Sequence, residues 1–334
     1  MKRASTVCLF LLFILCLGPS SQAGWMNDGV PVAPRSGAAG DGVIAADGAG
    51  GTFFAYKACY QGVSHILVQH IDASGDALWE ADGVVVCAMP SFQQNLSIVS
   101  DEAGGAIVAW DDDRSGDTNI YAQRVDDTGV VQWTTNGVAL TTAAGRQFGP
   151  GILSDGTGGA YIAWTSGDYT NYDLYIRRID AAGTPQWTEN GLPLSTATGN
   201  QAGPNLSTDG AGGVIVAWTD SRSGTNDIYA QRVDTEGGRH WTIDGVPLCT
   251  AVESQADPQL VPDGAGGAIA VWVDGRGGGF FSEDLYAQRV NAAGTLQWTA
   301  DGVAVCTASG GQSNPRAVSD GAGGAIVTWD DSRT

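Results

Sequence analysis

Acidic and basic side chains recur in register along this chain of 334 residues, and they are the first candidates for chemistry. An aspartate stands two residues before an arginine in Asp112/Arg114, Asp220/Arg222, Asp274/Arg276 and Asp331/Arg333. Aspartate side chains close turns, and an arginine can bridge a carboxylate and loop carbonyls. We therefore interpret these pairs as structural parts of a repeat, typified by Asp220 and Arg222.

The same loop allows a second interpretation, which is calcium binding. Asp111, Asp113 and Ser115 place side-chain oxygens at alternate positions, as the start of a calcium loop does, and calcium prefers oxygen ligands. The segment lacks the closing glutamate of such a loop, and its counterpart at 219–222 has lost two of the acids. Calcium is the one cofactor that the sequence suggests. The alternative is that these residues only close a turn.

A recurrent glutamine precedes each repeat, at Gln93, Gln147, Gln201, Gln255 and Gln312. We interpret Gln201 and its counterparts as buried amides that satisfy backbone groups, because buried polar groups are nearly always hydrogen-bonded. The alternative is that they line a central funnel together with the Asp/Arg loops.

Side chains that interrupt the repeat are better candidates for a function specific to this chain. Two phenylalanines occupy a glycine-rich insertion, and two tyrosines replace the Asp/Arg pattern of another loop, close to a further arginine and phenylalanine. An acidic face with exposed aromatic rings suits a polymer such as a glycan or a peptide. The predicted ligand-binding residues are Phe280, Phe281, Tyr169, Tyr172, Arg146 and Phe148.

Nucleophilic and zinc catalysis have little support in the sequence. His65 and His70 are an odd number of residues apart on one strand and so face opposite sides, and His240 lies three repeats away. The sequence contains no Gly-x-Ser-x-Gly, His-Glu-x-x-His or Cys-x-x-Cys motif. We predict no catalytic residue from the sequence.

These candidates are carried by a repeat of about 54 residues. The motif Asp-x-x-Gly-Gly occurs at Asp47, Asp101, Asp155, Asp209, Asp263 and Asp320. Each period holds four short β-like runs separated by turn residues, for example 205–208, 214–218, 227–233 and the run around Trp241. Four antiparallel strands per period predict an all-β protein, a β-propeller of about six blades.

All eleven tryptophans fall at two positions of this repeat, which makes them candidates for its core. Trp110 and Trp218 represent the position at the end of the second run. The other position follows an Asp-x-x-Gly turn, as in the segment from Asp180 to Trp187. This element resembles the turn-and-tryptophan docking element of quinoprotein-type propellers, and the whole unit is similar to repeats in exported bacterial β-propeller proteins. The resemblance implies the fold, whereas the quinone-binding residues of those enzymes have no counterparts here.

The two ends of the repeat region predict how the ring closes. The segment 24–30 matches a fourth strand, and the last residues supply only a first and a second strand. We expect a last blade shared between both ends and lacking one strand, as in a fragment of a longer protein. The propeller domain would span 24–334.

Residues 1–23 read as a secretory signal peptide, with Lys2 and Arg3, an apolar run at 7–17 and a small-residue site at Ala23. Its removal leaves 14 basic against 36 acidic residues, a net charge of 14 − 36 = −22. Such a charge disfavours nucleic-acid partners, and nothing after the signal is apolar enough to insert into a membrane. We expect a secreted, periplasmic or cell-surface protein.

Two functions fit these observations. The first is an exported non-enzymatic scaffold that binds an extracellular protein or glycan, and the second is a hydrolase or lyase that acts on extracellular polysaccharide. An enzyme should gather carboxylates that break the repeat in one funnel, whereas a scaffold should leave the funnel lined by the recurrent Asp, Arg and Gln side chains.

Overall fold

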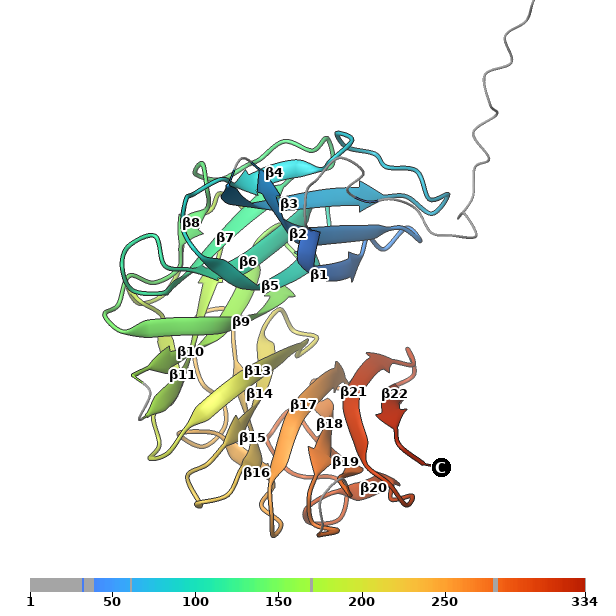
Figure 1. The fold of residues 1–334 in the computed structure, drawn as a ribbon. Coiled ribbons are helices and arrows are strands. Elements are labelled where there is room, and N and C mark those ends of the chain that lie inside the picture. Colours follow the sequence, from blue (N-terminus) through green and yellow to red (C-terminus); the bar gives the residue numbers. More distant parts are fainter. Residues whose placement is uncertain (1–31, 33–38, 61, 169–170, 279–281, 334) are drawn as a thin grey trace, which may run out of the picture.

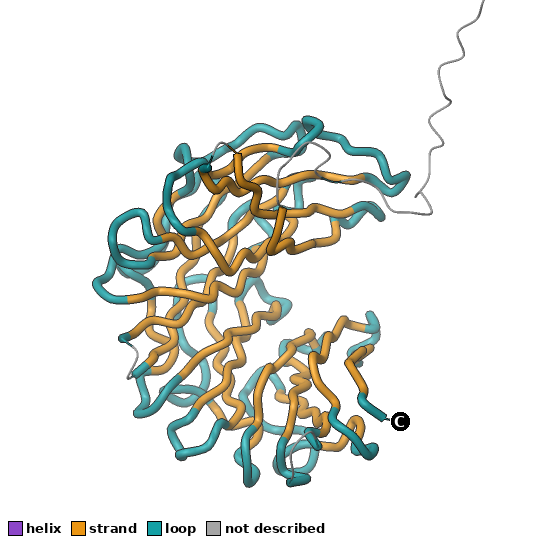
Figure 2. Tube along the Cα trace, in the orientation of Figure 1, coloured by secondary structure: helices purple, strands orange, loops and turns teal. Residues whose placement is uncertain are grey.

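The computed structural model describes residues 32, 39–60, 62–168, 171–278 and 282–333. Successive antiparallel sheets follow one another around an open arc, with the first strand of each sheet toward the inside (Figure 1). Figure 2 shows strands joined by loops and turns, and the described residues contain no helix. Accordingly, no helix in these ranges is long and apolar enough to span a membrane.

Five sheets have four strands each, and we number them as blades 1 to 5. Blade 1 contains β1 (Ala39–Ala46), β2 (Thr52–Tyr60), β3 (Val63–Ile71) and β4 (Val84–Cys87). Blade 2 contains β5 (Gln93–Ser100), β6 (Ala106–Asp112), β7 (Asn119–Val125) and β8 (Val138–Ala139). Blade 3 contains β9 (Arg146–Ser154), β10 (Ala160–Gly167), β11 (Tyr172–Ile179) and β12 (Leu192–Ser195).

The remaining sheets continue the same order. Blade 4 contains β13 (Gln201–Thr208), β14 (Val214–Asp220), β15 (Asp227–Val233) and β16 (Val246–Cys249). Blade 5 contains β17 (Gln255–Pro262), β18 (Ala268–Asp274), β19 (Asp284–Val290) and β20 (Val303–Cys306). A sixth sheet contains β21 (Gln312–Ser319) and β22 (Ala325–Asp331). The prediction of a β-propeller with four-stranded antiparallel blades is confirmed.

The second strands form the core because sheets cover both of their faces. In β6 every residue is buried, which explains why its sequence is apolar without alternation. Trp110, Trp164, Trp218 and Trp272 close these strands with no exposed surface, and Tyr56 takes the same place in blade 1. Burying side chains of this size contributes on the order of 2 to 3 kcal/mol each.

An irregularity in the first strand of each sheet shapes the inner surface of the arc. In blade 2 the pairing of β5 with β6 shifts between Gln94 and Ser97, and Asn95 adopts a left-handed φ of 52°. Asp41, Gly149, Gly203, Asp257 and Asn314 have positive φ at the same position of the other sheets. Asparagine, aspartate and glycine tolerate this conformation best, so the backbone restricts this position to three residue types.

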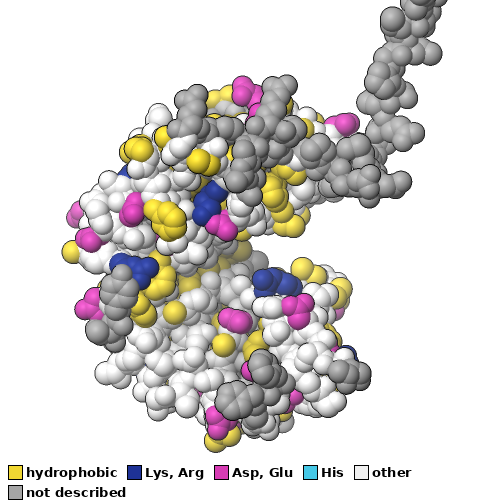
Figure 3. Space-filling model, viewed as in Figure 1, with side chains coloured by type: hydrophobic (Ala, Val, Ile, Leu, Met, Phe, Trp, Pro, Cys, Tyr) yellow, Lys and Arg dark blue, Asp and Glu magenta, His cyan; other side chains and the backbone are white. Residues whose placement is uncertain are grey.

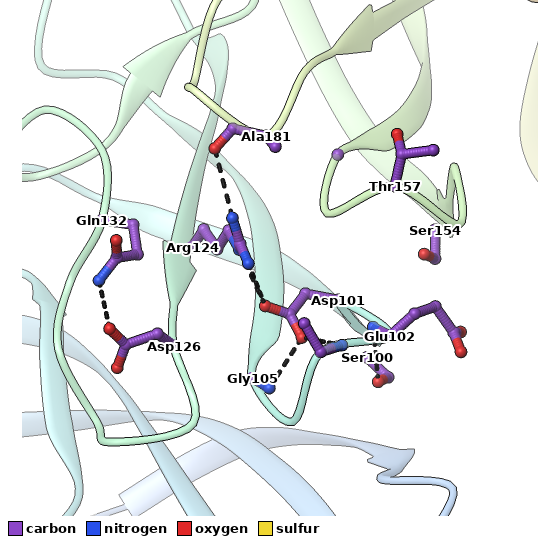
Figure 4. Close-up of polar contacts among 12 residues, drawn as sticks. Ser100, Asp101, Glu102, Gly105, Arg124, Asp126, Gln132, Ser154, Thr157 and Ala181 are labelled. Atoms are coloured by element: carbon purple, nitrogen blue, oxygen red, sulfur yellow. Dashed lines mark hydrogen bonds and ion pairs between the residues drawn. The ribbon is translucent and has the colours of Figure 1, made fainter.

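The Asp-x-x-Gly-Gly turn is closed by its aspartate and tied to the next strands by an arginine. Asp101 Oδ1 accepts hydrogen bonds from the amides of Ala103 (2.8 Å) and Gly105 (2.7 Å). Its Oδ2 accepts one from Arg124 Nε (2.8 Å), whose Nη1 also donates to the carbonyl of Ala181 in the next blade (3.4 Å; Figure 4). Arg178, Arg232 and Arg289 pair with their turn aspartates in the same way.

The second set of tryptophans joins each blade to the next. Trp133 Nε1 donates to the carbonyl of Ala181 (3.0 Å), and its ring lies so close to Gly183 that an added Cβ would approach it to 2.6 Å. Trp79, Trp187 and Trp241 donate to Asp127, Thr235 and Ala292 in the same manner. The glycine of the Asp-x-x-Gly turn is therefore required for the contact between blades.

Three predictions about the ends of the chain lie outside the described residues or are met only in part. The signal peptide at 1–23 and the strand at 24–30 fall in the ranges that the structure does not describe. Within the described residues, the sixth sheet has two strands. Sheet 6 and blade 1 lie at opposite ends of the arc, and Figure 3 shows an open hollow between them.

Glu102 offers a test of the turn geometry. It has a φ of 61° at a position where the other five repeats have Gly48, Gly156, Gly210, Gly264 and Gly321, all with positive φ. Figure 4 shows its side chain pointing away from Asp101 and Arg124. A side chain in the left-handed region costs about 1 kcal/mol, so Glu102→Gly should raise the free energy of unfolding by that amount.

Urea unfolding followed by tryptophan fluorescence measures this change. Glu102→Ala is the matched control, because it removes the carboxylate and keeps the Cβ, and it should leave stability nearly unchanged. Equal stabilisation by both substitutions would mean that the charge of Glu102, and not its backbone, carries the cost.

Candidate functional site

The recurrent Asp/Arg loops direct their charges into the blades. Asp220 Oδ2 accepts a hydrogen bond from Trp218 Nε1 (2.8 Å), and Asp220 Oδ1 accepts one from Arg222 Nε (2.8 Å). Arg222 also donates to the carbonyl of Asp244 (2.7 Å) and stacks on the ring of Tyr229 at 3.9 Å. These hydrogen bonds and this ring contact join Asp220 and Arg222 to residues of their own blade.

The recurrent glutamines are likewise turned inward. Gln201 is fully buried, and its Nε2 donates to the carbonyl of Gly199 (3.3 Å). Gln93, Gln147, Gln255 and Gln312 are also buried and donate to carbonyls of the loops that precede them. The inner surface of the arc is consequently lined by other residues, which differ from blade to blade.

Side chains at positions that vary between the repeats gather on the inner strands and adjoining loops of blades 1 to 3. Contacts between neighbouring side chains connect most of them. They include carboxylates, cations, an amide and aromatic rings. We call them the inner-rim cluster, which consists of Asp41, Lys57, Phe92, Asn95, Asp111, Arg146, Phe148 and Tyr172. Figure 3 shows acidic, basic and apolar side chains interspersed over this part of the arc.

Lys57 connects blade 1 to blade 2. Its Nζ forms an ion pair with Asp41 and donates a hydrogen bond to the carbonyl of Gln93 (3.2 Å). It also lies 5.7 Å from the ring centroid of Phe92, a phenylalanine that is 62% exposed. The Phe92 ring therefore has a face open to solvent and a cation beside it.

Asp111 lies at the contact between blades 2 and 3 and has no exposed surface. Burial raises the pKa of its carboxyl to about 6, although the Asn95 amide, the Gly149 backbone amide and the Arg146 guanidinium act in the opposite direction. Asn95 Nδ2 donates to Asp111 Oδ2 (2.9 Å), while Asn95 itself is exposed. Asp111 thus holds the side chain of an exposed asparagine in a fixed orientation.

Arg146, Phe148 and Tyr172 form an aromatic group in blade 3. The Arg146 guanidinium lies 5.0 Å from the centroid of the Phe148 ring, and the Tyr172 ring meets Phe148 edge-on at 5.2 Å. The structure therefore brings together three of the six side chains that the sequence indicated for ligand binding. Phe280, Phe281 and Tyr169 lie outside the described residues.

Blades 4 and 5 carry smaller side chains at the corresponding positions. Asn200 and Ser254 replace Arg146, Ala202 and Ala256 replace Phe148, and Thr219 and Val273 replace Asp111. The aromatic and basic members of the inner-rim cluster are thus confined to blades 1 to 3, whereas the hydrogen bond between Asn95 and Asp111 recurs between Asn314 and Asp330 in sheet 6. The grouping of rings and cations favours a ligand that extends over neighbouring blades.

The three residues of the calcium hypothesis have separate partners. Asp111 accepts from Asn95, Asp113 Oδ1 accepts from the amide of Phe92 (2.8 Å), and Ser115 Oγ donates to the carbonyl of Asp117 (3.1 Å). No group of three acidic, histidine or cysteine side chains converges in the part of the chain that the structure describes. Calcium binding stays a prediction from the sequence.

The sequence analysis missed Asp41, Lys57, Phe92 and Asn95. A signal for two of them was present, because Lys57 and Phe92 stand at repeat positions that carry other residue types in every other repeat. Asp41 and Asn95 could not be found in this way, since aspartate, asparagine and glycine all occur at their position. The position of these two side chains in the cluster depends on the irregular pairing of the first strands.

Comparisons with known proteins identify the fold and no family. No family model matches the chain, and no curated protein matches it. Among solved structures it is similar to a Hadza microbial sialidase, at 11% identity and a TM-score of 0.51, over 85% of this chain and 61% of the sialidase. It is also similar to a polysaccharide lyase, an ulvan lyase bound to -[GlcA(1-4)Rha3S]-, at 10% identity and a TM-score of 0.50, over 80% of this chain and 71% of the lyase.

These likenesses establish the class of protein, a β-propeller, and at such identities they establish the fold alone. The described part of the chain thus adopts a fold on which both a sialidase and a polysaccharide lyase are built.

The buried carboxyl of Asp111 predicts a measurable pH dependence of stability. A carboxyl whose pKa is raised from 3.8 to about 6 on folding binds more protons in the folded state between these values. Stability should therefore rise by about 1.4 kcal/mol as the pH falls from 7 to 5, and by roughly 3 kcal/mol in all once the pH lies below 3.8. Asp111→Asn should remove this contribution and flatten the profile, as measured by urea unfolding at several pH values.

Asp330→Asn is the matched control for this measurement. Asp330 occupies the same repeat position and accepts a hydrogen bond from Asn314 (2.8 Å), but it is exposed. Its replacement should leave the pH profile unchanged. An Asp111→Asn protein with the slope of the original protein would show that Asp111 is ionised in the folded state throughout this range.

Proposed function

We propose that this protein is an exported β-propeller that binds a polysaccharide at the inner-rim cluster and cleaves it by hydrolysis or elimination. The observation that carries the proposal is the gathering of aromatic, basic, amide and carboxylate side chains at variable repeat positions of blades 1 to 3, while the recurrent Asp, Arg and Gln side chains are bound inside the blades. This is the arrangement expected of a propeller whose inner surface is specialised for a ligand.

The chemistry of the cluster suits a sugar polymer. The faces of Phe92 and Tyr172 can pack against the apolar faces of sugar rings, and the Asn95 amide and the Arg146 guanidinium can bind hydroxyl and ring oxygens. Members of the cluster come from three neighbouring blades, so successive sugar units would contact successive blades.

Cleavage requires a group that donates a proton to the leaving oxygen and a second group that attacks, or that removes a proton. With its pKa of about 6, Asp111 is the carboxyl of the cluster that holds a proton most readily near neutral pH. Asp41 is the second carboxyl, on the first blade. Because Asp111 is buried behind Asn95, proton transfer to a substrate requires the Asn95 side chain to swing aside.

A non-catalytic scaffold that binds the same polysaccharide is the second candidate. The full burial of Asp111 and the ion pair between Asp41 and Lys57 favour it, because neither carboxyl is directly available to a substrate in this structure. Export is supported by the signal-like residues 1–23, and calcium at Asp111, Asp113 and Ser115 would belong to either candidate as a stabilising ion.

Binding and cleavage are tested on a panel of plant, algal and bacterial polysaccharides. Affinity electrophoresis reports binding, and the release of reducing ends or of unsaturated products reports cleavage. Replacing Phe92 and Tyr172 together by alanine should weaken binding about tenfold or more, since two ring contacts contribute on the order of 1 kcal/mol each. Asp111→Asn should abolish product release and change binding far less.

Ser254→Ala is the matched control, because Ser254 stands in blade 5 at the position of Arg146. It should change neither readout. Binding without any product from the unsubstituted protein would select the scaffold over the enzyme. Absence of binding to the whole panel would overturn the proposed function.

A further inference from the structure

The charges around the inner-rim cluster narrow the class of polysaccharide, an inference that rests on the proposed function. The whole chain has a net charge of −20, and half of its 16 basic residues are engaged in the recurrent ion pairs with aspartates. Cations that could face a ligand are consequently few. The local balance of charge at the cluster decides what it can attract.

Four carboxylates contact the cluster or belong to it. Besides Asp41 and Asp111, Asp113 accepts a hydrogen bond from the Phe92 amide, and Asp117 accepts one from the amide of Gly145, next to Arg146 (3.2 Å). Asp113 and Asp117 are exposed. They therefore project negative charge toward any ligand that contacts Phe92 or Arg146.

The two cations of the cluster are already engaged with the protein. Lys57 pairs with Asp41 and donates to a backbone carbonyl, and only 19% of its side chain is exposed. Arg146 stacks on Phe148 and lies near enough to Asp111 for its charge to stabilise the ionised carboxyl. Two engaged cations do not offset four carboxylates, so the cluster is acidic at neutral pH.

We infer that the polysaccharide carries no acidic groups, which leaves hydrolysis, or elimination from an esterified uronate, as the cleavage reaction. A uronate or sulfate bound here would lose hydration and would meet Asp41, Asp113 and Asp117, whose charges outnumber that of Arg146, the cation that can reach it. A neutral sugar gains instead, because its hydroxyl hydrogens can be donated to these same carboxylates and charge-assisted hydrogen bonds are stronger than neutral ones. The rings of Phe92 and Tyr172 supply the remaining contact surface.

Matched pairs of polymers test this inference on a constant backbone. The probes are dextran with dextran sulfate, hydroxyethylcellulose with carboxymethylcellulose, and methyl-esterified pectin with polygalacturonate. In each pair that binds, the neutral member should bind about tenfold or more tightly at low ionic strength. The difference should shrink at about 1 M salt, where charges are screened within about 3 Å.

Charge-removing variants show whether the named carboxylates are responsible. Asp113→Asn with Asp117→Asn keeps oxygen acceptors for the Phe92 and Gly145 amides and removes two charges, so it should narrow the difference between neutral and acidic polymers severalfold. Asp76→Asn is the control, because it removes an exposed acid from the connection between β3 and β4 of blade 1. It should leave the difference in affinity between neutral and acidic polymers unchanged.

The outcomes separate this inference from the proposed function. Tighter binding of the acidic members would overturn the inference and leave the proposed function standing. If no member of any pair binds and the wider panel also fails, the proposed function is wrong and the inference falls with it. Preference for neutral members that the double variant does not reduce would overturn the assignment to Asp113 and Asp117.

Discussion

The contact between a tryptophan indole and a turn of the next blade is the constraint on which this architecture depends. Trp133 illustrates it: the indole donates to the carbonyl of Ala181, and its ring covers Gly183. The same carbonyl accepts a bond from Arg124, which is held in place by Asp101. One carbonyl oxygen thus receives donors from two elements of the preceding blade, and the spacing between blades is fixed at this point.

This constraint explains why the charged side chains that recur within the repeat say little about activity. The recurrent aspartates and arginines could be mistaken for a ring of catalytic groups, but their hydrogen bonds end on backbone amides, carbonyls and tryptophans of the same or the neighbouring blade. A residue that maintains the blade must recur in nearly every blade. Positions with few structural duties, such as those of Arg146 and Phe148, are therefore the ones at which a ligand-binding group can be accommodated without loss of the fold.

The sequence was sufficient for the blade and insufficient for the site, for physical reasons. Period, strand order and the burial of Trp110 and Trp218 follow from turn chemistry and from runs of apolar residues, which are local properties. The grouping of Arg146, Phe148 and Tyr172 was foreseen because all three break the pattern in one repeat. The link from Asp41 through Lys57 to Phe92 was not, since it crosses between blades and depends on the left-handed residue that redirects each first strand.

That left-handed position also explains how one scaffold can present different groups on its inner surface. The backbone admits glycine, asparagine or aspartate there. The residue after the core aromatic side chain (tryptophan, or Tyr56 in blade 1) varies from Lys57 through Asp111 to Thr219 and Val273. In blade 2 the two positions act together, because a buried carboxyl fixes an exposed amide. Where both positions are small, as in blade 4 with Gly203 and Thr219, the inner surface carries no comparable group. The backbone of the repeat decides where a functional side chain can stand, and the pairing of these two positions decides whether it is held rigidly enough to recognise a ligand.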